Sequence, residues 1–234
     1  MQQIMTGQPS VLPPAGNWER TNLSFGLNTY TGDQNSQQLM AQLNSTMQFG
    51  RFESDMFGNF GVARAVGQHQ TNQEDVDWAY RYSLRTKSNW FAMIHTWYEH
   101  DETSGIDFRG AIGPGIGVHA INNNKMRLTF ETGFAATTEE QVHDARYIAF
   151  FFDPSIRWNI TKKLDLQQKL NIRLNMNDSR DVRIYTNADL MYAITERVGI
   201  GFGLTIDYDR QPVVGHRPTD IQTATNFTVA LGKQ

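Results

Sequence analysis

The chain has 234 residues, a formal net charge of −3 and no cysteine. Disulfides and thiolate metal sites are therefore excluded, and no basic patch with interleaved aromatic residues suggests nucleic-acid binding. Hydrophobic residues make up 39% of the chain, and the mean hydropathy is −0.50. No apolar run approaches the ~20 residues of a spanning helix, which excludes a helical membrane protein.

The N-terminal residues 1–17 are rich in Pro, Gln and Gly, and we expect an extended lead-in there. Within it, residues 1–16 contain no apolar core of the signal-peptide type. The remaining residues, 18–234, have a length that a single domain can accommodate.

From the lead-in to the C-terminus, apolar and polar residues alternate in segments that turns separate. The even positions of residues 164–176 are apolar except for Gln168, and every even position from Val198 to Tyr208 is apolar. A period of two indicates strands with one apolar and one polar face. We predict twelve strands, over residues 19–31, 38–50, 56–66, 76–86, 90–100, 106–121, 126–136, 146–159, 164–176, 181–194, 198–209 and 220–231.

These strands are about eleven residues long or more, which suffices to cross a bilayer at a tilt. A soluble β-sandwich is the alternative, but its strands average ~5–6 residues and its outward faces are polar. The sequence therefore predicts an all-β fold, namely a single up-and-down antiparallel transmembrane β-barrel. Its apolar side chains face lipid, and its polar side chains line a lumen.

The connections alternate in length along the chain, as they do in barrels with short periplasmic turns and longer outer loops. Five are predicted to be tight, at residues 52–55, 87–89, 122–125, 161–163 and 195–197. Three are predicted to be long, at residues 67–75, 137–145 and 210–219. Both termini then lie on the periplasmic side.

The predicted lipid face is even-numbered from residue 76 to 209 and odd-numbered in the first two strands and the last. The strand over 56–66 is ambiguous. Both faces of the strand over 90–100 are apolar enough to face lipid, and we choose the even face because this places His95 and Glu99 in the lumen. Aromatic residues near strand ends suit the two lipid–water boundaries. The predicted aromatic girdle comprises Trp78, Trp90, Tyr98, Phe108, Trp158, Tyr192 and Tyr208.

Charged residues on the opposite face are the candidates for lining the lumen. They are Arg81, Arg85, Glu99, Asp107, Arg109, Arg127, Glu131, Asp165, Lys169, Arg173, Arg183, Asp189 and Asp207. Two interpretations stay open, an ion-pair network that fixes the strand register and a water-filled pore whose charges select ions. The mixed signs predict neither anion nor cation preference. Asp107 and Arg109 share parity, which predicts a salt bridge at the loop-side mouth or part of a selectivity ring.

Two runs of alternate glycines, at residues 113–117 and 199–203, also face inward. Neither run has the strand–turn–helix context of a phosphate-binding loop. Either bulky partners such as Phe91, Met93 and Trp97 fill the space above the glycines, or the glycines widen the lumen.

Two stretches resemble a salt-induced outer-membrane protein family of bacteria. The first, at residues 89–119, has Trp90 at the start of a strand, the acidic pair Asp101-Glu102, the segment SGIDFR at 104–109 and glycines at 113, 115 and 117. The second is RVGIGFGLTIDYDRQPV followed by TDIQTATNFTVALG. The resemblance implies a barrel in a Gram-negative outer membrane and no reaction.

One departure from outer-membrane barrels concerns the C-terminus. Such barrels usually end in an aromatic residue that the insertion machinery reads, whereas this chain ends in LGKQ. The insertion route is therefore in question more than the fold. An outer-membrane protein also requires a signal peptide, which we expect to have been removed from this chain.

No catalytic, cofactor or metal site is predicted. His100-Asp101 and His143-Asp144 are placed at or in loops, where outer-membrane proteases carry His-Asp pairs, but no serine elbow, nucleophile–base pair or metal-ligand spacing accompanies them. We therefore do not expect an enzyme. The loops are acidic, and we expect them to bind divalent cations. The other expected partners are outer-membrane lipid and lipopolysaccharide, with a homo-oligomer or larger membrane assembly left open.

The function that the sequence favours is a narrow passive channel for ions or small solutes in a bacterial outer membrane. The alternative is a structural or interaction barrel with a plugged lumen, serving as a membrane anchor, assembly partner or receptor.

Overall fold

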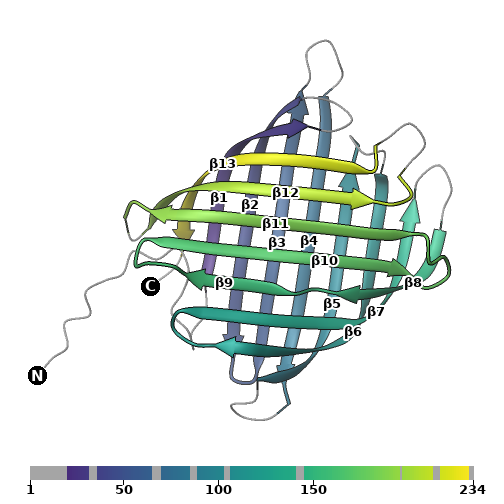
Figure 1. Cartoon of the computed structure of the whole chain (residues 1–234), viewed down its shortest axis with the longest axis horizontal. Coiled ribbons are helices and arrows are strands. Elements are labelled where there is room, and N and C mark those ends of the chain that lie inside the picture. The colour runs from purple at the N-terminus through teal and green to yellow at the C-terminus, as the bar shows by residue number, and fades with distance from the viewer. Residues whose placement is uncertain are drawn as a thin grey trace, which may run out of the picture.

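A computed structural model describes residues 20–31, 36–64, 70–84, 89–102, 106–140, 145–195, 197–212 and 217–231. The predicted lead-in at residues 1–17 lies outside these ranges. Thirteen antiparallel β-segments make up the described fold (Figure 1). They are β1 (Arg20–Thr31), β2 (Ser36–Phe49), β3 (Phe52–Arg64), β4 (Gln70–Ser83), β5 (Trp90–Asp101), β6 (Ile106–Asn122), β7 (Met126–Glu140), β8 (Ala145–Phe152), β9 (Ser155–Asn159), β10 (Leu164–Asn175), β11 (Val182–Ala193), β12 (Val198–Asp209) and β13 (Thr219–Leu231).

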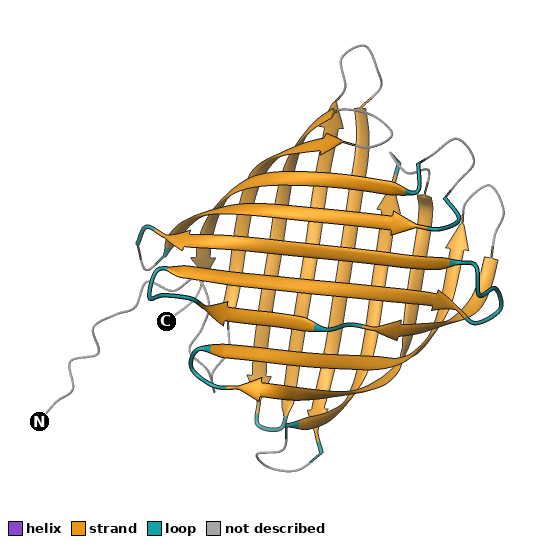
Figure 2. Ribbon diagram, in the orientation of Figure 1, coloured by secondary structure: helices purple, strands orange, loops and turns teal. Residues whose placement is uncertain are grey.

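The sheet closes on itself, because β1 pairs with both β2 and β13 (Figure 2). Together, β8 and β9 form a single strand of the barrel wall, because both pair with β7 and β10 and the break at Asp153-Pro154 leaves the register unchanged. We call each such wall strand a stave. The fold is therefore a closed antiparallel barrel of twelve staves in an all-β protein, as predicted. In the described ranges, no helix is long and apolar enough to cross a membrane.

The first tight turn differs from its prediction at residues 52–55. Phe49 pairs with Phe52, so the turn consists of Gly50 and Arg51. Gly50 has a φ of 62°, a left-handed conformation that suits a two-residue hairpin and costs glycine little. The strand β3 therefore begins early enough to place Glu53 and Asp55 inside the barrel.

Two of the long connections are shorter in the structure than predicted. The strand β4 begins at Gln70, within the predicted loop 67–75, and β7 continues to Glu140, within the predicted loop 137–145. Acidic residues suggested solvated loops at both places. In the barrel a carboxylate can instead continue a strand, because an inward position gives it basic partners.

Large apolar side chains face outward on most of the strands. Both ambiguous strands are resolved: Phe60 and Val62 of β3 face outward, and Ile94 of β5 is 47% exposed whereas His95 is 1% exposed. A soluble protein would hide most of these side chains. Exposed large apolar residues include Phe25, Leu27, Leu39, Met47, Phe49, Phe52, Phe60, Val62, Trp78, Trp90, Ile94, Ile112, Ile116, Phe134, Ile148, Leu190, Ile200, Phe202, Ile221 and Phe227.

A β-bulge near the start of β6 reverses the face on which one predicted site residue lies. Glu99 pairs with Arg109, and Asp101 pairs with Ile106, so β6 has one extra residue between these pairs. The extra residue reverses the alternation. Ile106 is therefore buried on the cavity wall and Asp107 is exposed. The prediction that Asp107 lines the lumen is wrong.

Part of the interior is filled by an apolar cluster from β4 to β8. Its largest members are Phe91, Met93 and Phe151, with Trp97 packed against them. The glycines of β6 make room for this cluster: a Cβ at Gly115 would lie 2.8 Å from the Phe151 ring, and one at Gly117 would overlap the Phe91 ring. On β6, therefore, bulky partners fill the space beside the glycines.

Candidate functional site

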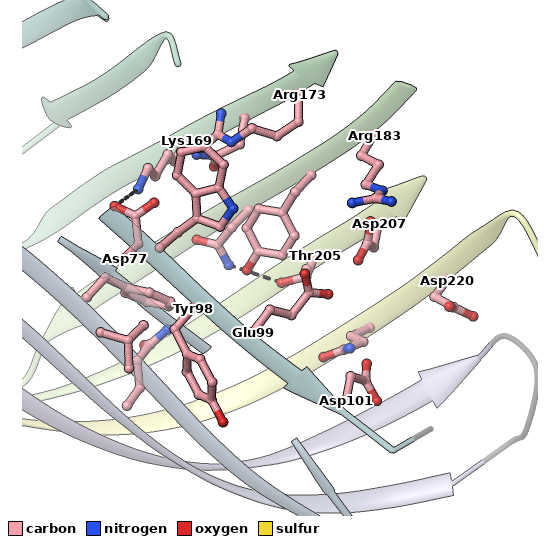
Figure 3. Close-up of a pocket in the computed structure, with 18 of the residues that line it drawn as sticks. Asp77, Tyr98, Glu99, Asp101, Lys169, Arg173, Arg183, Thr205, Asp207 and Asp220 are labelled. Carbon is pink, nitrogen blue, oxygen red and sulfur yellow. Dashed lines mark hydrogen bonds and ion pairs between the residues drawn. The ribbon is translucent and has the colours of Figure 1, made fainter. Parts of the chain in front are cut away.

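A cavity of about 240 Å³ lies inside the barrel (Figure 3). Its wall includes Asp101, Asp209 and Asp220 at the rim of the longer connections, and it continues inward to Ser24 and Arg157. Nine carboxylates and seven basic side chains line it. The carboxylates are Asp55, Asp77, Glu99, Asp101, Glu131, Asp189, Asp207, Asp209 and Asp220, and the basic residues are Arg81, Arg109, Arg157, Lys169, Arg173, Arg183 and Arg217.

A smaller cavity of about 40 Å³ adjoins the first toward the rim of the short turns. It reaches Asn22 and Asp165, which lie within three residues of the strand ends at that rim. Residues of β1, β2, β10, β11 and β13 line both cavities where they meet. These shared residues are Ser24, Gln42, Asn44, Gln167, Asp189 and Asn226. We call them the junction ring.

Arg81 of β4 is the centre of one ion-pair layer. Its Nη1 lies 3.1 Å from Oε1 of Glu53 and 3.2 Å from Oδ2 of Asp55, while its Nε donates to Glu131. Arg127 of β7 donates from Nη2 to both oxygens of Glu53 at 2.8 Å. Two neighbouring carboxylates of β3 are thus neutralised by arginines from other strands.

A second layer lies beside the apolar cluster. Lys169 Nζ of β10 lies 2.9 Å from Oδ1 of Asp77 on β4, as Figure 3 shows. His95 stands between two carboxylates, with Nε2 3.1 Å from Asp77 and Nδ1 3.4 Å from Asp153. Arg173 pairs with Asp153, and its guanidinium lies 4.3 Å from the centre of the Trp97 ring. Contacts from β4, β5 and β10 therefore cross this part of the lumen.

A third layer lies toward the longer connections. Arg109 of β6 has Nη1 2.6 Å from Glu99 and Nη2 3.2 Å from Glu139. Arg183 of β11 reaches the same Glu139 at 2.9 Å and Asp209 at 3.2 Å. The three layers together bridge strands from β3 to β12. On the side of β13, β1 and β2 the cavity wall carries mostly neutral polar residues.

The predicted lumen residues fall into five groups. On the larger cavity lie Arg81, Glu99, Arg109, Glu131, Lys169, Arg173, Arg183, Asp189 and Asp207. Asp165 lines only the smaller cavity, which Asp189 lines as well. Arg127 is buried behind the cavity wall against Glu53. Asp107 faces outward, and Arg85 lies outside the described residues.

Several interior residues were missing from the prediction. Glu53, Asp55 and Glu139 had been placed in turns or loops, and Asp77 was not singled out. The available signal was parity: Glu53 and Asp55 alternate with Phe52 and Ser54 in the same way as the lumen residues of other strands. Their arginine partners are distant in sequence, so the pairing itself left no local pattern.

The predicted girdle residues occupy different depths. Trp90 is the first residue of β5, while Trp158, Tyr192 and Tyr208 are each next to last in their strands. Tyr98 and Phe108 pack against each other, with ring centres 5.6 Å apart, near the rim of the longer connections, where Tyr208 also lies. Trp78 is the ninth residue of β4, because that strand begins earlier than predicted. Its Nε1 donates to the hydroxyl of Ser54 at 2.8 Å.

One ion pair that shifts a pKa lies outside the strands, in the connection between β10 and β11. Arg180 donates hydrogen bonds to both carboxylate oxygens of Asp178 at 3.0 Å. These bonds lower the pKa of Asp178 to about 2. Across the part of the chain that the structure describes, no group of three or more His, Asp or Glu side chains is arranged to hold a metal ion.

Residues 23–231 match the family described as a protein of unknown function, DUF481. The chain belongs to this family. The description does not mention salt, so the name expected from the sequence motif is not confirmed. No curated protein matches the chain.

Solved structures of outer-membrane barrels share the architecture. The NanC porin aligns with a TM-score of 0.61 and 10% identity, over 89% of this chain and 100% of the porin. The COG4313 outer membrane channel from Pseudomonas putida F1 aligns with a TM-score of 0.54 and 10% identity, over 96% of this chain and 98% of the channel. The KdgM porin in complex with disordered oligogalacturonate gives 0.51 and 9% identity, over 90% and 99%. At these identities the likeness shows the fold alone.

Proposed function

We propose that this protein is a narrow passive channel for ions or small polar solutes in a bacterial outer membrane. The observation that carries the proposal is the pair of adjoining cavities. The larger reaches Asp220 near one end of β13, and the smaller reaches Thr228 near the other. A polar path therefore follows most of the length of the strands.

The outer surface supports a place in a membrane. Apolar side chains face outward around the barrel, and every backbone strand has a partner on both sides, which is the arrangement that a bilayer core demands. The named structural neighbours are porins and an outer membrane channel, which supports the outer membrane as the location.

The filled half of the lumen supports a small solute size. Cross-lumen ion pairs and the apolar cluster occupy the space from β3 to β10, which leaves the path along β11, β12, β13, β1 and β2 and the adjoining end of β10. Barrels of eight strands are filled by side chains, and those of 16–18 strands hold wide aqueous channels. A half-filled barrel of twelve staves lies between these cases.

The same filling favours a second candidate function, a structural or interaction barrel that conducts nothing. Phe91 and Phe151 are almost completely buried inside the barrel, where an open pore would hold water. If the junction ring also closes in the membrane, the path is blocked and the barrel serves as an anchor or partner.

Single-channel conductance of the refolded protein in a planar bilayer tests the proposal. Discrete current steps are expected from the channel. A silent bilayer, with insertion verified by protease protection, would overturn the channel and support the structural barrel. An empty bilayer treated with the same detergent serves as the control.

We also propose that the outer surface contacts outer-membrane lipid and lipopolysaccharide, and that divalent cations bind at the acidic rim. Asp144 of that rim lies outside the described residues, and Glu139 and Asp101 are buried, so fewer carboxylates than expected face solvent. The test is thermal unfolding with Ca²⁺, with Mg²⁺ and with a chelator. An unchanged unfolding temperature and unchanged loop proteolysis would overturn cation binding.

A further inference from the structure

The basic side chains of the lumen are neutralised by ion pairs with neighbouring carboxylates. Six basic side chains on the larger cavity make ion pairs, namely Arg81, Arg109, Arg157, Lys169, Arg173 and Arg183. Arg157, for example, pairs with Asp55 at 3.1 Å, and Lys169 pairs with Asp77 at 2.9 Å. A solute on the path therefore meets these cations only together with their carboxylate partners.

Two carboxylates on the path are not compensated in this way. Asp189 of β11 and Asp207 of β12 line the larger cavity, and no basic side chain of the described residues forms an ion pair with either. Figure 3 shows Asp207 and Glu99 on the wall of the same cavity, Asp207 from β12 and Glu99 from β5. Negative charge thus exceeds positive charge along the open side of the lumen.

Asp189 lies where the larger cavity meets the smaller one. It is the only charged member of the junction ring, whose other members are Ser24 and amide side chains. Its cross-strand neighbour is Gly203, where a Cβ would lie 2.6 Å from Oδ1 of Asp189. The glycine therefore leaves room for the carboxylate at this level. The other charged residue of the smaller cavity, Asp165, is also acidic.

We propose that the path selects small cations, with Asp189 as the main selectivity-determining residue and Asp207 as a second one nearer the mouth. This inference rests on the proposed channel function. A carboxylate attracts a cation and repels an anion, and both effects grow where the path is narrow and little water screens the charge. The amide and hydroxyl oxygens of the junction ring can replace part of the hydration shell of the cation.

The expected size of the effect follows from Coulomb attraction. A unit charge ~6 Å from the path in a water-like dielectric changes the concentration of a monovalent ion about threefold. The ratio of K⁺ to Cl⁻ permeability is therefore expected to exceed one in the wild type, and to fall by about threefold or more in Asp189→Asn.

The experiment is the reversal potential of single channels under a KCl gradient. The variants are Asp189→Asn and Asp207→Asn, with the exposed Asp107→Asn as the matched control, which removes the same charge from the outer surface. Circular dichroism verifies that each variant keeps its strands. A permeability ratio above one that falls in both lumen variants and stays constant in the control supports the proposal.

Each contrary outcome has a distinct meaning. Current steps with a preference for Cl⁻, or a reversal potential that both lumen variants leave unchanged, would overturn cation selection and leave the channel intact. The absence of steps in the inserted wild type would overturn the channel and this inference with it. If Asp189→Asn does not fold, Asp207→Asn decides the question alone.

Discussion

Arg157 of β9 and Asp55 of β3 form an ion pair of 3.1 Å across the inside of the barrel, with β4, β5, β6 and β7 between their strands in the sheet. The two residues are 102 positions apart in the chain. Thr46 of β2 also donates to Asp55 at 2.8 Å, and Arg81 of β4 lies 3.2 Å from it, so three other strands converge on one carboxylate. Such a contact holds opposite walls at a fixed distance and narrows the lumen.

Removal of either partner is expected to destabilise the barrel. Removal of both is expected to lower the free energy of unfolding by less than the sum of the two single losses. Asp55→Asn leaves the Arg157 guanidinium without its carboxylate, at an expected cost of ~1–3 kcal/mol in the free energy of unfolding. Arg157→Gln should cost a similar amount, with a coupling energy of ~0.5–3 kcal/mol in the double variant. Urea unfolding in lipid vesicles, followed by tryptophan fluorescence, measures all three. Strictly additive costs would show that the cross-lumen contact contributes nothing.

Gly113→Ala is expected to destabilise the contact between β6 and β7. An added Cβ would overlap the backbone of Phe134 and Ala135, and backbone atoms cannot move aside as a flexible side chain can. Overpacking of this kind costs ~1–3 kcal/mol. Gly58→Ala is the matched control, because its nearest neighbour is the Phe60 ring at 3.5 Å. Equal unfolding free energies of the two variants would contradict the close approach.

Phe91→Ala is expected to raise the conductance and lower the stability together. Phe91 is 1% exposed, packs on the His119 ring with centres 4.7 Å apart, and fills space inside the barrel. Truncation of a buried phenylalanine costs ~3–5 kcal/mol and leaves a cavity within the apolar cluster inside the barrel. Single-channel recording and urea unfolding measure the two effects. Trp90→Ala, on the outward face, should leave the conductance unchanged, and the same current in both variants would argue against a plug.

Arg180→Gln is expected to raise the pKa of Asp178 from about 2 toward its ordinary value. A depressed pKa means that the hydrogen bonds favour the ionised carboxylate above its unfolded pKa, and that this contribution is lost as the pH falls toward 2. Carboxyl carbon chemical shifts in an NMR titration measure the change. The side chain of Arg180 is 74% exposed and that of Asp178 is 33% exposed, so the ion pair contributes little to stability and the unfolding temperature at neutral pH should hardly move. A low pKa in the variant would assign the shift to the backbone of the connection.

The sequence indicated most of the interior because alternation is a local property. Residues such as Arg81, Lys169 and Asp189 follow from counting by two along one strand. The same counting fails at Asp107, where a bulge in β6 reverses the faces, and at Glu53, because the tight turn at Gly50-Arg51 is predicted at residues 52–55. Bulges and turn positions depend on pairing with a neighbouring strand, which a single strand cannot reveal.

By itself, the sequence determined the all-β class, the number of staves and the outward direction of the apolar faces, because a period of two fixes which side chains share a face. Only the tertiary structure decided which charges meet. Arg157 and Asp55, or Lys169 and Asp77, become partners because closure of the sheet brings distant staves to opposite sides of one lumen. Closure also decided that the ion-pair layers and the apolar cluster lie along β3 to β10, and that Asp189 lines both cavities without an ion pair to any basic side chain of the described residues.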